Sequence, residues 1–176
     1  MLMPLSTVRD FITADIPDGI LALRLSRLES LIRSYTNNNF VLPGWGQDCE
    51  LQSGGLLSVN EGIYSENDTI LITHSLRSDG LYTVTSVEDD ALYKLSSDTQ
   101  DDKGFANLVL YPPDVKMGAV MMLSYDLTRT DSEGIKTETV SRHSVEYLDS
   151  TDSNTILGYP VHLTSFLKPY RKARRY

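Results

Sequence analysis

Residues 15–37 read DIPDGILALRLSRLESLIRSYTN. Apolar side chains recur in this stretch in steps of three and four, at Leu21, Leu25, Leu28, Ile32 and Tyr35. That spacing places side chains on one face of an α-helix, so we predict a helix that buries this face against other helices. We expect Asp15 to cap its start and Pro17 to lie in its first turn, and Asn37, Asn38 and Asn39 offer residues that tolerate a left-handed end.

Helical spacing occurs in three further segments. Residues 5–12 predict a short N-terminal helix, residues 113–127 a longer one, and residues 160–167 a last helix that Pro169 stops. Gly118 lies inside the longer helix, where glycine is unfavourable, and therefore predicts close packing at that point. The polar, Thr- and Ser-rich residues 128–141 are expected to form a long loop, and residues 144–148 a strand after it.

The middle of the chain has the patterns of strands. Apolar, β-branched and aromatic residues gather in short runs at residues 56–59, 69–73, 81–87, 92–95 and 108–111. Turn-forming residues separate these runs, which predicts a small antiparallel sheet that packs on the helices. The polar residues 96–104 are expected to form a loop. Residues 40–55 carry Pro43 and several glycines and predict irregular structure.

These patterns predict an α+β fold. We expect a small bundle of about four helices with an inserted small antiparallel β-sheet and an extended C-terminal arm. Residues 1–40 would supply the N-terminal helices of the bundle, residues 41–111 the β-rich insert, and residues 112–176 the remaining helices, the long loop and the arm.

Charge is unevenly distributed along the 176 residues, whose net charge is −8. Five basic residues and no acid occur from residue 168 to the end, which leaves 11 basic and 24 acidic residues in the remainder. An acidic body is unsuited to gripping nucleic acid over a broad face. The single Cys49 forms no internal disulfide and indicates a reducing cytosol, and the sequence shows neither a signal peptide nor an apolar run of membrane-spanning length.

No pattern in the sequence indicates catalysis or metal binding. The three histidines, His74, His143 and His162, are far apart and lie in no spaced metal motif. The carboxylate clusters near residues 88–90 and 98–102 lack the alternation of a calcium loop, and no phosphate-binding glycine-rich loop is present. Ser141 does not lie on a nucleophile elbow, so we discount a triad with His143 and Asp149. We expect no enzyme, no cofactor and no metal.

Several stretches resemble one family of proteins in the same order. They are residues 28–40, DGLYTV at 79–84, YPPDVKMG at 111–118, residues 134–147, and GYP followed by FLKPYRKAR at 158–174. Together they resemble the head–tail connector, or adaptor, proteins of long-tailed double-stranded DNA phages, particularly those of Gram-positive hosts. The resemblance implies a structural virion protein, made in the host cytoplasm and placed in the neck between head and tail.

The resemblance also implies partners. Such proteins form a ring, typically of twelve copies, under the portal protein; the ring extends the DNA channel, and the next neck or tail-completion protein docks on it. DNA passes without specific binding, and no membrane is involved. The resemblance implies a portal-docking arm comprising Tyr159, Pro160, Phe166, Leu167, Lys168, Tyr170, Arg171, Lys172 and Arg174. It implies an inter-subunit or channel loop that includes Thr137, Glu138, Ser141, Arg142 and His143.

Two alternatives remain open at this point. The first is a head-closure or tail-completion protein that stacks in the same neck. The second belongs to another class: a monomeric module that binds a peptide or saccharide on the β insert, with Trp45, Tyr64 and Tyr82 as an aromatic platform. Ring number and direct portal contact would separate the first from a connector, and a defined aromatic pocket on a stable monomer would favour the second.

Overall fold

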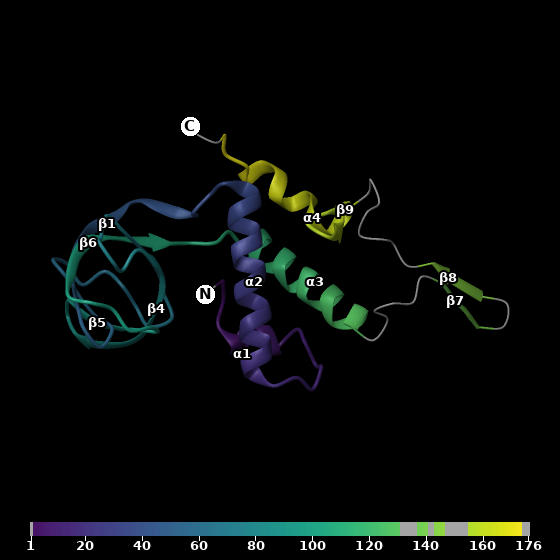
Figure 1. The fold of residues 1–176 in the computed structure, drawn as a ribbon, viewed down its shortest axis with the longest axis horizontal. Coiled ribbons are helices and arrows are strands. Elements are labelled where there is room, and N and C mark those ends of the chain that lie inside the picture. Colours follow the sequence, from purple (N-terminus) through teal and green to yellow (C-terminus); the bar gives the residue numbers. More distant parts are fainter. Residues whose placement is uncertain (1, 131–136, 141–142, 147–154, 174–176) are drawn as a thin grey trace. The chain divides into compact units, whose positions relative to one another are not determined.

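The chain divides into two compact units (Figure 1). The computed structural model describes residues 2–130, 137–140, 143–146 and 155–173. We call Met1–Pro4 with Asn39–Tyr111 the barrel unit, and Leu5–Asn38 with Pro112–Tyr176 the helical unit.

The barrel unit contains six strands that close on themselves in the order β1-β2-β5-β4-β3-β6, with every neighbouring pair antiparallel. The strands are β1 (Val41–Gln52), β2 (Leu56–Val59), β3 (Thr69–Thr73), β4 (Gly80–Asp89), β5 (Leu92–Leu95) and β6 (Asp102–Val109). The strands predicted at residues 56–59, 69–73, 81–87 and 92–95 are therefore confirmed. Closure leaves the barrel no free edge for other chains to extend.

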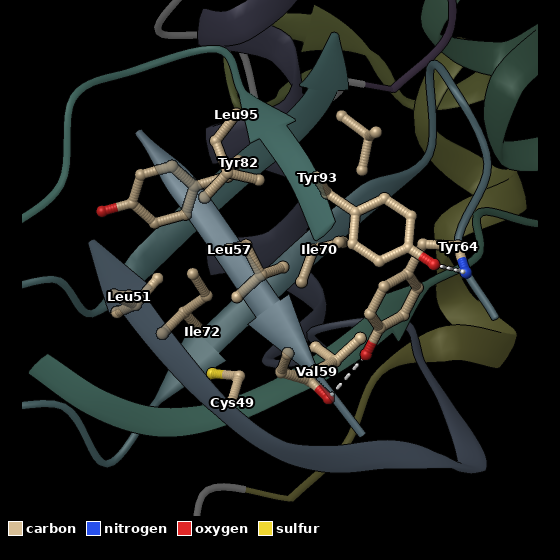
Figure 2. Packing of buried hydrophobic residues seen from close by; sticks show 12 residues of the cluster. Cys49, Leu51, Leu57, Val59, Tyr64, Ile70, Ile72, Tyr82, Tyr93 and Leu95 are labelled. Atoms are coloured by element: carbon tan, nitrogen blue, oxygen red, sulfur yellow. Dashed lines mark hydrogen bonds between the residues drawn. The ribbon is translucent and has the colours of Figure 1, made fainter. Parts of the chain in front are cut away.

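The barrel has an apolar interior of its own. Inward side chains from all six strands pack together, including Leu57, Ile70, Val84 and Ala106, which are fully buried. Figure 2 labels ten of them, among which Leu57 of β2 and Ile70 of β3 point into the same interior. Because the barrel buries this core among its own residues, it does not need the helices to complete it.

The predicted fold class is wrong about the β-rich part and about the number of helices. We expected a helical bundle with a small inserted sheet that packs on it, whereas the β-rich part is a closed six-stranded barrel. Only two helices of the described residues, α2 (Asp18–Thr36) and α3 (Pro113–Thr130), are long. The others are α1 (Leu5–Arg9) and α4 (Val161–Thr164), the latter continuing into the 3₁₀-helix η1 (Ser165–Tyr170).

The error arose at β1 and β6. Between Val41 and Gly46 the pairing with β6 advances only from Val109 to Asn107, so most of residues 42–45 bulge out of the ladder. The bulge holds Pro43 and Gly44, which in sequence indicate a loop. The polar start of β6, from Asp102, was likewise predicted as loop, and the expected strand at 108–111 ends early.

The helical unit is built on the predicted stripe of α2. Leu21, Leu25, Leu28 and Ile32 are fully buried, which confirms the helix and its packing face. The predicted left-handed end is confirmed, and of the three asparagines offered for it Asn37 is the C-cap, with φ of 49°. The start differs, because Pro17 rather than Asp15 occupies the N-cap, without a side-chain cap.

Three long-range contacts tie α3 into the helical unit. A Cβ placed on Gly118 would overlap the Phe166 ring, which confirms the predicted close packing. The Tyr159 hydroxyl donates to Asp126 Oδ2 at 2.6 Å, and Arg27 of α2 donates to the same oxygen at 3.2 Å. These contacts join α2, α3 and the C-terminal segment.

The segment after α3 differs from the expected loop. Residues 128–130 still belong to α3, and β7 (Thr137–Val140) pairs with β8 (His143–Glu146) as a two-stranded antiparallel sheet. A second short pair, β9 (Thr155–Ile156) with β10 (Tyr159–Pro160), leads into α4. The strand expected at residues 144–148 overlaps β8, and its last two residues lie outside the described residues.

Candidate functional site

The C-terminal segment is fastened to the end of α2 through its backbone. The Lys172 N–H donates to the Thr36 carbonyl at 2.8 Å. The side-chain amide of Asn37 donates to the Ala173 carbonyl at 3.0 Å, and that of Asn38 to the Tyr170 carbonyl at 3.3 Å. The backbone from Tyr170, the last residue of η1, to Ala173 is therefore held in place by the end of α2.

Two aromatic side chains complete this attachment. The Tyr170 hydroxyl donates to Asp114 at the start of α3, 2.8 Å from each carboxylate oxygen, and this hydrogen bond raises the pKa of Tyr170. The Arg171 guanidinium lies over the Tyr35 ring at 4.9 Å from its centroid, a cation–π geometry. The attachment thus orients the side chains of the segment as well as its backbone.

Lys168, Arg171 and Lys172 remain exposed on this attached segment, and we call these three residues the basic C-terminal surface. The carbonyl end of α2 carries a partial negative charge, which favours cations nearby. Arg171, over the Tyr35 ring in the last turn of α2, is placed to stabilise that end of the helix. The exposure of all three cations on a fixed backbone also suits a second role, contact with an acidic protein surface.

The remaining residues of the predicted portal-docking arm have structural positions. Tyr159, Pro160 and Leu167 are buried, and the half-buried Phe166 ring lies over Gly118. These side chains pack within the helical unit and hold the segment in place. Arg174 lies outside the described residues.

The predicted inter-subunit or channel loop corresponds in part to the β7–β8 hairpin. Thr137 pairs with Glu146, Glu138 with Val145, and His143 with Val140. Ser141 and Arg142 lie outside the described residues. A two-stranded hairpin alone is marginally stable in water, so further contacts would stabilise this one.

The barrel does not assemble the predicted aromatic platform. Tyr64 and Tyr82 are buried inside it, where their hydroxyls donate to the carbonyls of Ala106 and Ser78, both at 3.0 Å. Only Trp45, on the bulge of β1, is exposed. Burial raises the pKa of Tyr64 to about 12, so this hydroxyl is held neutral as a donor.

The carboxylate cluster at residues 98–102 fastens the loops at the ends of strands. Asp101 accepts the Ser53 N–H and Asp98 the Gly54 N–H, each at 2.6 Å. Asp102 accepts the Leu76 N–H at 2.6 Å. Among the described residues, no group of three histidine, cysteine or acidic side chains is placed to hold a metal ion. Through these hydrogen bonds Asp98, Asp101 and Asp102 hold the backbone of neighbouring loops.

Two further predictions concern Cys49 and membranes. Cys49 is buried in the barrel core, and burial raises its thiol pKa to about 11, as for an inert structural cysteine. No helix within the described residues has the length and hydropathy needed to span a bilayer.

Sequence reasoning missed the features that fix the basic C-terminal surface. The Asn37-Asn38-Asn39 run was interpreted only as a helix stop, yet two of these amides hold the C-terminal backbone. Its unusual density of amides was the available signal. Neither protein-family models nor curated protein sequences match this chain.

Proposed function

We propose that this protein is a non-catalytic structural protein of the phage neck, a head–tail connector that docks on the portal through its basic C-terminal surface. In this role copies form a ring that extends the DNA channel and offers a platform to the next neck protein. The proposal combines the sequence resemblance with the exposed surface formed by Lys168, Arg171 and Lys172.

The observation that carries the proposal is the attachment of residues 170–173. Tethers from Asn37, Asn38 and Thr36 order this backbone in the isolated chain. Ordering it before binding lowers the entropic cost of association. Three cations on a prepared backbone therefore support a docking role better than three cations on a free tail.

The charge distribution also suits a channel through which DNA slides. Every phosphate that a ring neutralises adds affinity through counterion release, and many such contacts would hold the duplex. The net charge of −8 disfavours such contacts. The few cations of the basic C-terminal surface are then better matched to an acidic portal surface than to DNA.

The test is portal binding by a variant in which Lys168, Arg171 and Lys172 are all changed to Gln. Exposed ion pairs contribute about 0.2–1 kcal/mol each, so losing three should weaken binding about tenfold at low salt and less at high salt. Binding to the purified portal of the same phage would be measured by sedimentation velocity at two ionic strengths.

A matched control removes the same amount of charge from the barrel, by changing Arg77, Lys94 and Lys103 to Gln. This control should bind the portal as the natural chain does. Equal binding by both variants would overturn the docking surface. A natural chain that forms rings but ignores the portal would favour the alternative of a head-closure or tail-completion protein.

A further inference from the structure

The backbone around Arg171 is held on both sides by the end of α2. The carbonyl of Tyr170, which belongs to the peptide unit before Arg171, accepts the Asn38 side-chain amide at 3.3 Å. The N–H of Lys172, which belongs to the peptide unit after it, donates to the Thr36 carbonyl at 2.8 Å. Because both planar peptide units are held, the direction in which the Arg171 side chain leaves the backbone is fixed as well.

The guanidinium of Arg171 has one defined neighbour. Its central carbon lies 4.9 Å from the centroid of the half-buried Tyr35 ring. Among the described residues this group makes neither a hydrogen bond nor an ion pair, so its N–H donors remain available to a partner. Contact with the ring restricts the rotation of the guanidinium, and a group that is oriented before binding loses less entropy when a partner binds it.

The two lysines of the basic C-terminal surface differ in this respect. Lys168 and Lys172 are exposed, and no side chain in the part of the chain that the structure describes holds either ammonium group. An ammonium is a compact charge on a flexible stem, whereas a guanidinium is a planar fork whose donors match the two oxygens of a carboxylate. Of the three cations, Arg171 is therefore the one that is both oriented and shaped for bidentate recognition.

We propose that Arg171 binds one particular carboxylate of the portal protein through two parallel hydrogen bonds, and that the Tyr35 ring positions it for this contact. The inference rests on the portal docking proposed above and names the partner group, an aspartate or glutamate side chain. Lys168 and Lys172 add attraction to any negative charge nearby. The surface then selects its partner through the geometry at Arg171, and the two lysines contribute charge alone.

A charge-preserving exchange tests this assignment. Arg171→Lys keeps the net charge and removes the fork, so binding to the purified portal of the same phage should weaken about fivefold. This loss should be the same at low and high salt, whereas the loss caused by the charge-removing Lys172→Gln should shrink at high salt. Arg77→Lys on the barrel is the matched control and should bind as the natural chain does. Sedimentation velocity would measure all four chains.

The positioning role of Tyr35 is tested through its effect on Arg171. Tyr35→Leu should weaken portal binding about threefold, and Tyr35→Phe, which restores the ring, should recover it. In a chain that already carries Arg171→Gln, adding Tyr35→Leu should weaken binding no further. An equal loss with and without Arg171→Gln would show that the ring acts on the fold alone and would overturn its positioning role. Urea denaturation of each variant measures any loss of stability separately.

Crosslinking identifies the group that faces position 171 in the complex. A carbodiimide joins amines to carboxylates that are in contact. The amine introduced by Arg171→Lys should therefore become linked to one aspartate or glutamate of the portal, as mapped by mass spectrometry. Crosslinks from Lys168 and Lys172 alone would overturn the assignment.

The outcomes separate this assignment from the docking function. Portal binding by Arg171→Lys equal to that of the natural chain would overturn the assignment and leave the docking function standing. A natural chain that does not bind the portal would overturn the docking function and the assignment with it. Binding of the natural chain to a DNA duplex in place of the portal, weakened by Arg171→Lys, would overturn both and assign the surface to phosphate groups.

Discussion

Removing the hydroxyl of Tyr159 tests how the C-terminal segment is held. Tyr159 is 1% exposed, and its hydroxyl donates to Asp126 Oδ2 at 2.6 Å. In Tyr159→Phe the carboxylate keeps Arg27 at 3.2 Å and loses the shorter hydrogen bond. A hydrogen bond to a charged acceptor contributes about 1.5–3 kcal/mol, so we expect a loss of about 2 kcal/mol in the free energy of unfolding.

The same contact makes a prediction at high pH. Burial, together with the hydrogen bond to Asp126, raises the pKa of Tyr159 above its ordinary value. The folded-state pKa is therefore higher than the unfolded one. The stabilisation is complete below the ordinary tyrosine pKa of about 10 and is lost as the pH rises from there toward the folded-state value. Tyr159→Phe should lose less stability over this range than the natural chain.

The assay is urea denaturation followed by circular dichroism at the helical band, with Asp126→Asn and the double variant completing a cycle. We expect a coupling free energy of about 1–2 kcal/mol between the two residues. A coupling below about 0.3 kcal/mol, with an unchanged alkaline profile, would show that the hydrogen bond does not tie the C-terminal segment to α3.

Other predictions concern packing, the barrel core and its loops. Gly118→Ala should destabilise the helical unit by about 1–2 kcal/mol, because overpacking against Phe166 outweighs the better helix propensity of alanine. Adding Phe166→Leu to this variant should recover part of the lost free energy of unfolding, measured by urea denaturation. Cys49, with its pKa raised to about 11, should react with a thiol reagent at pH 8 only as fast as the barrel opens, and a rapid stoichiometric reaction would contradict its burial. Hydrogen bonds lower the pKa values of Asp79 and Asp102 in the folded barrel. Their contribution to the free energy of unfolding should therefore be complete above the ordinary aspartate pKa and be lost as the pH falls through the folded-state values. Asp102→Asn should reduce this acid sensitivity, measured by tryptophan fluorescence.

The helices were predictable because their signal is local. The α2 stripe from Leu21 to Ile32 repeats at helical spacing, and tertiary contacts did not override it. The N-cap was not predictable in the same way. Asp15 is a preferred capping residue, yet the chain turns so that Pro17 begins the helix without a side-chain cap.

Barrel closure was not predictable because it depends on pairing between distant strands. In the pairing of β1 with β6, for example, Cys49 lies opposite Gly104. Neither residue is marked as a strand residue by its local sequence. Gly46 looked like loop punctuation, whereas a side chain there would collide with the Phe105 ring across the ladder. Local patterns show strands but do not show which of them complete a ring.

The candidate site was predictable in its charges and not in its attachment. Lys168, Arg171 and Lys172 stand out as cations without neighbouring acids. The tethers to α2 come from Asn37 and Asn38, more than a hundred residues earlier in the chain. The resemblance placed Tyr159 in a docking arm, and nothing in its sequence neighbourhood indicated its half-buried partner Asp126.

The way the chain enters and leaves the barrel has an evolutionary consequence. Val41 pairs with Val109, the Leu110 N–H donates to the Phe40 carbonyl at 2.9 Å, and the rings of Phe40 and Tyr111 lie 5.0 Å apart. The chain segments that enter and leave the barrel therefore run side by side. All six strands lie between these two neighbouring points of the chain. Such a module can be gained, lost or exchanged between lineages as a cassette, because a short turn could bridge the same gap at little entropic cost.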